Sequence, residues 1–178
     1  MCEKFIRESS NKSADVVIFP EMTLTGFSPG NILLIENIYN SHTLEWFGKL
    51  ANKYSINIIF GACLQEKGKS LPFNMLCIAD KKGAVIPLYA KTHLFTHANE
   101  DQYLIPGDKV VTYKIGDMVF GLAICYDLRF PELFSTMASS CDAIIIIANW
   151  PSSRADHWNI LLRARAIENE CIVFGVNR

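Results

Sequence analysis

The 178-residue sequence has little of what marks several large classes of protein. Its longest apolar runs, such as residues 143–150, are far too short to span a bilayer. Its net charge is −1 and its lysines and arginines are scattered, which excludes the basic stripe of a nucleic-acid-binding surface. Its six cysteines form no C-x-x-C pair, so neither a zinc ribbon nor a disulfide framework is indicated.

What is present is typical of one globular domain. Half of the residues (50%) are hydrophobic and 20% are charged, and the length is sufficient for a substantial core. No composition shift, repeat or linker divides the chain. Residues 1–4 lack the basic-then-apolar layout of a signal peptide, and the cysteines are widely spaced. We therefore expect a reducing, cytoplasmic environment.

Hydrophobic periodicity predicts alternating strands and helices. Apolar runs bounded by turn residues predict strands over 15–19, 56–63, 73–79, 84–89, 110–115, 118–124, 143–148 and 171–176, with hairpin turns at 80–83 and 116–117. Helical spacing predicts helices over 43–54, 131–139 and 154–170, the last with Trp158, Leu161, Leu162 and Ile167 near one face. This order predicts an α/β fold with a mixed sheet or two packed sheets.

Cys125 ends the apolar run 119–124 and is followed at once by polar residues and a predicted helix start. A thiol at a strand end before a turn can lie in a cleft, where backbone N–H groups or cations favour its thiolate. The alternative is a small buried hydrophobic residue, which is the commoner role of a cysteine. The local sequence alone leaves both open.

Three charged residues are further candidates for a catalytic site. Glu21 follows the predicted strand 15–19 at its carboxyl end, where ligands bind in open α/β sheets, so it is a candidate general base or a cap of the next turn. Lys91 follows the strand 84–89 and is either a solvated surface lysine or, in a cleft, a cation that stabilises an oxyanion. Glu100 lies in a polar loop and is by itself an ordinary loop acid.

Together these segments resemble the nitrilase, or carbon–nitrogen hydrolase, superfamily over essentially the whole chain. The matching segments, in the family's order, are Phe19-Pro20-Glu21-Met22, Lys91-Thr92-His93-Leu94-Phe95, Glu100 ahead of Pro106-Gly107-Asp108, and Ile124-Cys125-Tyr126-Asp127-Leu128-Arg129-Phe130-Pro131-Glu132. Carried over by matching motif, Cys125 is the nucleophile and Glu21 the base. Lys91 and the backbone N–H of Tyr126 hold the oxyanion, and Glu100 is the second glutamate.

The resemblance also implies a fold and partners. It implies an α-β-β-α sandwich in a single domain over 1–178, a small amide substrate, no cofactor, no metal and, for the full-length form, a homodimer. Family members begin with a strand before the helix that here is 2–13, and they continue beyond residues 176–178. We therefore expect a partial domain that lacks the first strand and the C-terminal strands. A non-catalytic remnant that retains the site residues is the rival hypothesis.

The subgroup is indicated by the C-terminal third. Residues 148–151, 154, 157–158 and 161–169 resemble the omega-amidase branch, whose enzymes hydrolyse the terminal amide of α-keto acids such as 2-oxoglutaramate. The deaminated-glutathione amidases share much of this helix and remain an alternative. An acidic amide needs a cation at its far end, for which Arg129 and Arg154 are candidates. Either arginine can instead be structural, Arg129 by pairing with Asp127 or Glu132.

His93 and His97 raise the possibility of a metal site, because histidines four residues apart on a helix can share a face. No third ligand at suitable spacing accompanies them, so we expect hydrogen-bonded or surface histidines. A zinc hydrolase is the weakest of the hypotheses. The remaining cysteines are expected to be core or surface thiols.

Overall fold

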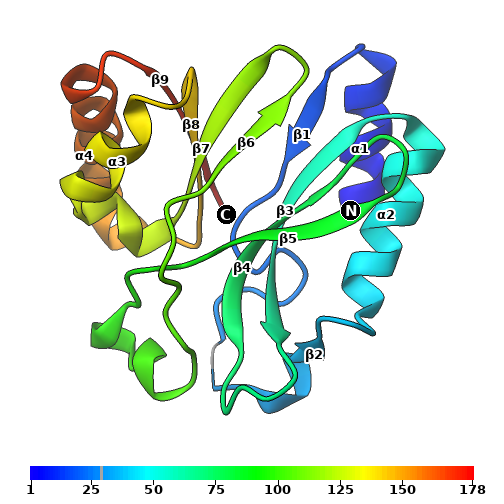
Figure 1. The fold of residues 1–178 in the computed structure, drawn as a ribbon, viewed down its shortest axis with the longest axis horizontal. Helices are drawn as coiled ribbons and strands as arrows, with labels where there is room; N and C mark the ends of the chain where they lie inside the picture. The colour runs from blue at the N-terminus through cyan, green and yellow to red at the C-terminus, as the bar shows by residue number, and fades with distance from the viewer. Residues whose placement is uncertain (29) are drawn as a thin grey trace.

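The computed structural model describes residues 1–28 and 30–178, and within them two β-sheets pack face to face between layers of helices (Figure 1). Helices α1 (Cys2–Asn11) and α2 (His42–Tyr54) cover one sheet, and α3 (Pro131–Ala138) and α4 (Ala155–Glu168) cover the other. The predicted α-β-β-α sandwich is confirmed, with two packed sheets. In the described residues, no helix combines the length and the apolar character that crossing a membrane requires.

The first sheet runs in the order β1 (Val16–Ile18), β3 (Asn57–Gln65), β4 (Phe73–Ala79) and β5 (Val85–Ala90), and β2 (Glu36–Asn37) also pairs with β3. Strands β1 and β2 are parallel to β3, whereas β4 is antiparallel to both β3 and β5. The predicted hairpin between β4 and β5 is confirmed. Strand β2 was not predicted, because two residues are too short to show a period.

The second sheet runs in the order β6 (Thr112–Ile115), β7 (Met118–Ile124), β8 (Ala143–Ala148) and β9 (Ile172–Asn177). The β6–β7 hairpin is antiparallel, as predicted, and its turn uses Gly116 at φ +61°. Strands β7, β8 and β9 are parallel, and α3 and α4 make the two crossovers. Every residue of β8 is buried, which explains its continuous apolar run.

The layers are held together by apolar packing on both faces of the first sheet. On the outer face, the rings of Phe47 and Phe60 stack at 4.0 Å between centroids, and both side chains are fully buried. On the inner face, Leu76 and Ile78 of β4 join the cluster that contains Leu122 and all of β8. Each such buried side chain contributes about 1.5–3 kcal/mol to stability.

The face predicted for α4 is partly wrong. Trp158 is buried and the leucines at 161–162 are half-buried, but Ile167 is 77% exposed. Arg165 takes the buried position instead, and its Nε and Nη2 donate to the carbonyl of Leu128 at 3.2 and 2.9 Å. A buried arginine with partners leaves no apolar signal in the sequence.

The topology brings strand ends to one side of the molecule. Strands β1 and β5 point the same way in the first sheet. Strand β1 is parallel to β3, and both β3 and β5 are antiparallel to β4. Glu21 and Lys91 follow their carboxyl ends. Cys125 and Asn149 follow the carboxyl ends of the parallel strands β7 and β8 in the other sheet. Residues from both sheets therefore meet at a shared edge.

Gly61 lets the loop that carries Glu21 lie directly on β3. A Cβ at Gly61 would stand 2.4 Å from the backbone nitrogen of Met22 and 2.8 Å from the Cα of Glu21. Thr23 fixes this approach, since its backbone N–H donates to the Gly61 carbonyl at 2.9 Å and its Oγ1 accepts from the Gly61 N–H at 3.0 Å. The close contact leaves no room for a side chain.

We therefore predict that Gly61→Ala lowers the free energy of unfolding by roughly 1–3 kcal/mol, because the added methyl group meets backbone rather than a movable side chain. Urea unfolding measures the change. Gly68→Asn is the control: no atom lies within 4 Å of a Cβ there, and asparagine tolerates the positive φ. Equal stability of the two variants would contradict the prediction.

Candidate active site

Glu21, Lys91, Glu100 and Cys125 meet between the two sheets. The Lys91 Nζ lies 3.0 Å from Oε1 of Glu21 and 2.9 Å from Oε2 of Glu100. The side chains of all three charged residues are fully buried, and Cys125 is 8% exposed. Burial of charges is costly unless they are paired and hydrogen-bonded. Here Lys91 is paired with both glutamates, and each charge has hydrogen-bond partners. The structure thus brings together the four residues that the sequence motifs predict.

Three of the four groups stand at or next to a left-handed backbone residue. Cys125 itself, which begins the 3₁₀ helix η4 (Cys125–Arg129), has φ +49°. Met22 (φ +43°) follows Glu21, and Asn99 (φ +55°) precedes Glu100. Residues other than glycine rarely adopt this conformation, and such outliers cluster at functional sites.

The surroundings of Cys125 favour its protonated thiol over the thiolate. Burial raises the pKa of Cys125 well above its ordinary value, and the negative charge of Glu21 raises it further. The ammonium of Lys91 and the backbone N–H of Asn149 lower this pKa but do not overcome burial. Lys91 and the Asn149 N–H thus favour the thiolate, whereas burial and Glu21 favour the protonated thiol. A base must take the proton if the sulfur is to attack.

Lys91 remains a cation. Burial alone would lower its pKa, but the negative charges of Glu21 and Glu100 outweigh that effect, and the net direction is upward. Glu100 is held in turn by the Phe95 backbone N–H, which donates to its Oε2 at 2.6 Å. The lysine therefore presents a fixed positive charge next to Cys125.

Two asparagines complete the polar cluster, and the motif analysis assigned neither of them. The Asn149 backbone N–H donates to Oε2 of Glu21 at 2.8 Å, and its side-chain amide donates to the Glu21 carbonyl at 2.6 Å. The Nδ2 of Asn74 donates to Oε1 of Glu21 at 2.7 Å and to Oε1 of Glu100 at 3.0 Å. A polar residue inside the apolar run 73–79 was the available signal for Asn74.

Asp127 ties the lysine segment to the cysteine turn and was also missed as a site residue. Its buried carboxylate accepts from the Ile124 backbone N–H at 2.9 Å and from the Tyr89 hydroxyl at 2.8 Å. Its other oxygen accepts from the hydroxyl of Thr92 at 3.0 Å and from the backbone N–H and Nδ1 of His93, both at 2.9 Å. Asp127 thereby joins the segment after β5 to the turn that carries Cys125.

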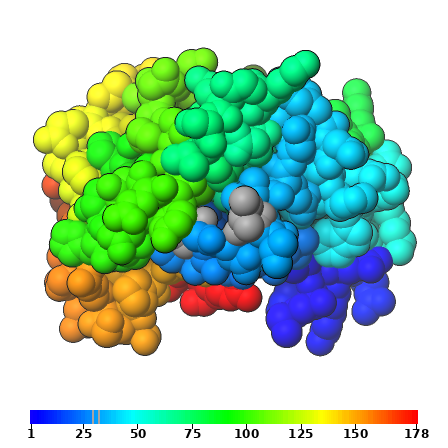
Figure 2. Space-filling view, turned by 90° about the horizontal axis from the view of Figure 1, so that it is seen from below, coloured from blue at the N-terminus to red at the C-terminus, as the bar shows by residue number. Residues whose placement is uncertain are grey.

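A pocket of about 190 Å³ opens onto Cys125. Its lining residues are Phe27, Lys91, Phe95, Ala98, Cys125, Tyr126, Arg129, Asn149, Trp150, Pro151 and Arg154. Figure 2 shows the segments that surround it meeting on one face: the green segment around residues 95–103, the blue segment before β2 and the orange start of α4. The lining is mostly apolar and aromatic, and its cations come from Lys91 and the two arginines.

The predicted ion pairs of Arg129 with Asp127 or Glu132 are wrong. Its Nη2 donates to Nδ1 of His157 at 3.1 Å, and its guanidinium lies 5.1 Å from the ring centre of Trp150. The guanidinium of Arg154 lies 5.9 Å from the Phe95 ring centre. Among residues 1–28 and 30–178, neither arginine has a carboxylate within ion-pair distance.

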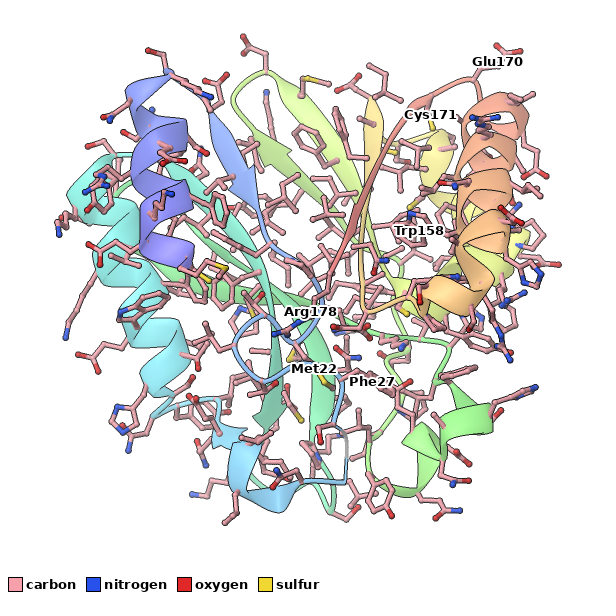
Figure 3. The ribbon with its side chains drawn as sticks, turned by 180° about the vertical axis from the view of Figure 1, so that it is seen from behind. Met22, Phe27, Trp158, Glu170, Cys171 and Arg178 are labelled. Atoms are coloured by element: carbon pink, nitrogen blue, oxygen red, sulfur yellow. The ribbon has the colours of Figure 1, made fainter. Side chains whose placement is uncertain are left out.

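The last residue of β9, Asn177, holds the backbone of Trp150, which lines the pocket. The side chain of Asn177 accepts from the Trp150 backbone N–H at 2.7 Å and donates to its carbonyl at 3.1 Å. Figure 3 shows Arg178 near Met22 and Phe27 at this end of the strand. Its Nη1 would lie 3.1 Å from a Cβ on Gly26, and the Phe27 ring centre lies 5.5 Å from the Nζ of Lys91.

The histidines and the other cysteines lie in other settings. His93 stacks on Phe130 with 3.7 Å between ring centroids, and His97 stacks on Phe95 at 5.7 Å. Within the part of the chain that the structure describes, no three His, Cys, Asp or Glu side chains gather in a way that could hold a metal ion. Cys63 is buried, which raises the pKa of its thiol to about 12, and Cys77 is fully buried.

Comparisons with known proteins agree with this geometry. The family model for carbon-nitrogen hydrolases matches residues 1–178. The chain is 35% identical over 175 residues to a 2-oxoglutaramate amidase of Bacillus subtilis strain 168, covering 98% of this chain and 67% of the relative. It is 33% identical over 165 residues to an omega-amidase of Escherichia coli strain K12, covering 92% of this chain and 62% of that protein.

A solved structure gives the same picture. A CN-hydrolase superfamily protein from Xanthomonas campestris, crystallised with an arsenic adduct in its active site, superposes with a TM-score of 0.87 at 32% identity. The match covers 99% of this chain and 69% of that protein. The chain thus spans about two thirds of the length of the proteins that it matches.

We predict that Asp127→Asn destabilises the fold. Both oxygens of the Asp127 carboxylate accept hydrogen bonds, and an amide would place N–H groups against some of those donors. Loss of a hydrogen bond to a charged group costs about 1.5–3 kcal/mol, and the free energy of unfolding from urea titration should fall by at least that much. Asp117→Asn, at an exposed turn residue, is the control and should change it by less than about 0.5 kcal/mol. Equal free energies of unfolding for the two variants would show that Asp127 does not join the segment after β5 to the Cys125 turn.

Proposed function

The chain belongs to the carbon-nitrogen hydrolase family and is a hydrolase that acts on amides, and from this premise we propose that it cleaves a small acidic carboxamide through a thioester on Cys125. The proposed substrate is the ω-amide of an α-keto acid such as 2-oxoglutaramate. The observation that supports the mechanism most strongly is the buried Lys91, held between two carboxylates next to the thiol of Cys125.

In the first step, Glu21 takes the proton of the Cys125 thiol as the sulfur bonds to the amide carbon. The π electrons of the carbonyl move to oxygen, and Lys91 with the Tyr126 backbone N–H holds the oxyanion. Tyr126 is the second residue of η4, where a backbone N–H has no partner within the helix. One such donor contributes about 3 kcal/mol to the transition state, so the position of the lysine is critical.

In the second step, the carbon–nitrogen bond breaks, the electron pair leaves with nitrogen, and Glu21 returns its proton to release ammonia. A thioester remains on Cys125. Glu21 then takes a proton from water as the hydroxide attacks the thioester carbon; the carbon–sulfur bond breaks, and the leaving thiolate takes that proton back from Glu21. Glu100 acts by holding Lys91, through contacts from both of its oxygens at 2.9 and 3.2 Å.

The pocket supports a small anionic substrate. Its volume of about 190 Å³ is below the roughly 300–1,000 Å³ of pockets that hold drug-sized ligands. Arg129 and Arg154 line it without a carboxylate partner among the described residues, so a substrate carboxylate can neutralise them. The same features favour a keto-acid amide over the bulkier deaminated glutathione.

The compartment and the oligomer are also proposals. The six cysteines, all within the described residues, are free thiols, which suits a reducing cytoplasm. The homodimer implied by the family resemblance remains a prediction.

We predict that Cys125→Ala reduces ammonia release from 2-oxoglutaramate to the background rate, because no other group can form the thioester. Cys141→Ala, at a half-buried thiol outside the pocket, is the matched control and should keep activity within about 2-fold. Trapping of a substrate adduct on Cys125 by mass spectrometry checks the intermediate. Equal loss in both variants would exclude Cys125 as the nucleophile, and a folded wild type with neither product nor adduct would favour a non-catalytic remnant.

We predict that Arg129→Gln and Arg154→Gln each raise the KM for 2-oxoglutaramate by about 10-fold, because each removes a cation from the subsite of the carboxylate. Steady-state kinetics with pentanamide, which lacks the carboxylate, should show less than about a 2-fold change. Arg163→Gln, at an exposed position of α4, is the control. Equal losses with the charged and the neutral amide would mean that the arginines are structural.

A further inference from the structure

Asn74 stands inside the charged cluster although it carries no charge. It lies on β4, and its backbone carbonyl accepts from the backbone N–H of Lys91 at 2.9 Å, which places Lys91, directly after β5, beside Asn74. Its side chain is fully buried, and its Nδ2 supplies one N–H to Glu21 and one to Glu100. Asn74 and Lys91 therefore both bridge the two glutamates.

The orientation of the Asn74 amide is determined by its neighbours. If the amide were turned over, its oxygen would face two carboxylate oxygens at 2.7 and 3.0 Å, which is repulsive. In the orientation observed, Oδ1 has no hydrogen-bond partner, alone among buried side-chain polar atoms in residues 1–28 and 30–178. An unpartnered buried oxygen has a desolvation cost, which an apolar residue of similar size would avoid. An apolar residue, however, could not donate the two N–H groups that Asn74 gives to Glu21 and Glu100.

The hydrogen bonds make the two oxygens of Glu21 unequal. Its Oε1 accepts from the Nζ of Lys91 at 3.0 Å and from Nδ2 of Asn74 at 2.7 Å, so both of its lone pairs are used. Its Oε2 accepts only the Asn149 backbone N–H, at 2.8 Å, and keeps a lone pair free. The thiol of Cys125 lies within hydrogen-bonding reach of both Glu21 and that same N–H.

We propose that Asn74 is a positioning residue that makes Oε2 of Glu21 the atom that takes the Cys125 proton. It acts by occupying Oε1 and by holding Glu21 and Glu100 at fixed separation across Lys91. An amide suits this position because it supplies two donors without charge. A second cation would neutralise the base, and a third carboxylate would repel both glutamates. The inference rests on the proposed role of Glu21 as the base.

The test compares Asn74→Leu and Asn74→Asp with Ile78→Val, a control that alters packing on the same buried face of β4 without touching a polar group. The first readout is the rate at which iodoacetamide alkylates Cys125, followed by mass spectrometry of its peptide from about pH 5 to about pH 9. The second is kcat and KM for 2-oxoglutaramate, and thermal unfolding of each variant accompanies both.

Asn74→Leu should lower the alkylation rate and kcat by about 100-fold, because the base is no longer aimed at the thiol, with KM changed by less than about 3-fold. Asn74→Asp should be equally slow at neutral pH. It should recover relative to wild type as the pH falls toward about 5, because the new carboxyl donates a hydrogen bond once it is protonated. Ile78→Val should stay within about 2-fold of wild type.

Alkylation of a folded Asn74→Leu within about 2-fold of wild type would overturn the proposal. If that variant does not fold, Asn74→Asp decides: a rate ratio to wild type that does not change with pH overturns it. Failure of the proposed function gives a different result. A wild type that releases no ammonia but alkylates Cys125 far faster than Cys141 overturns the substrate assignment, while the comparison of Asn74 variants still stands.

Discussion

The structure depends on one interaction, the burial of the Lys91 ammonium between the carboxylates of Glu21 and Glu100. Removing three charges from water costs several kcal/mol for each ion, and only close pairing with further hydrogen bonds offsets that cost. Glu21 lies 70 residues from Lys91, whereas Glu100 is nine residues from it, so the first sheet must form before all three can meet. The need to pair this lysine therefore fixes where the segments after β1 and β5 lie, and with them the wall that faces Cys125.

Most of the fold could be predicted from the sequence because its signals are local. The strands of both hairpins, the fully buried β8 and the helix that begins at Pro131 each show their period or their turn within a few residues. The errors have separate causes. Strand β2 is too short to have a period, and the buried position on α4 belongs to Arg165 rather than Ile167, because a distant carbonyl, that of Leu128, makes the burial of a charge acceptable.

The candidate site divides in the same way. Glu21, Lys91, Glu100 and Cys125 were found through the order of their motifs, and the structure brings them together. Asn74 and Asp127 were not found, because no local pattern reveals their partners. The partners of Asn74 lie 53 and 26 residues away in the sequence, and those of Asp127 lie 38 and 34 residues away. The motifs assign Glu21 as the base that takes the Cys125 proton, but the sequence does not show how completely the site excludes water, which raises the pKa of that thiol.

The left-handed backbone at Met22, Asn99 and Cys125 has a consequence for the evolution of the chain. Asparagine tolerates this conformation, but at Met22 and Cys125 it costs about 1–3 kcal/mol each, which the packing of the rest of the molecule must offset. Because the net stability of a domain is only about 5–15 kcal/mol, the site uses a large share of the margin that would otherwise absorb random substitutions. A destabilising substitution elsewhere in the layers is therefore less well tolerated than it would be without this strain.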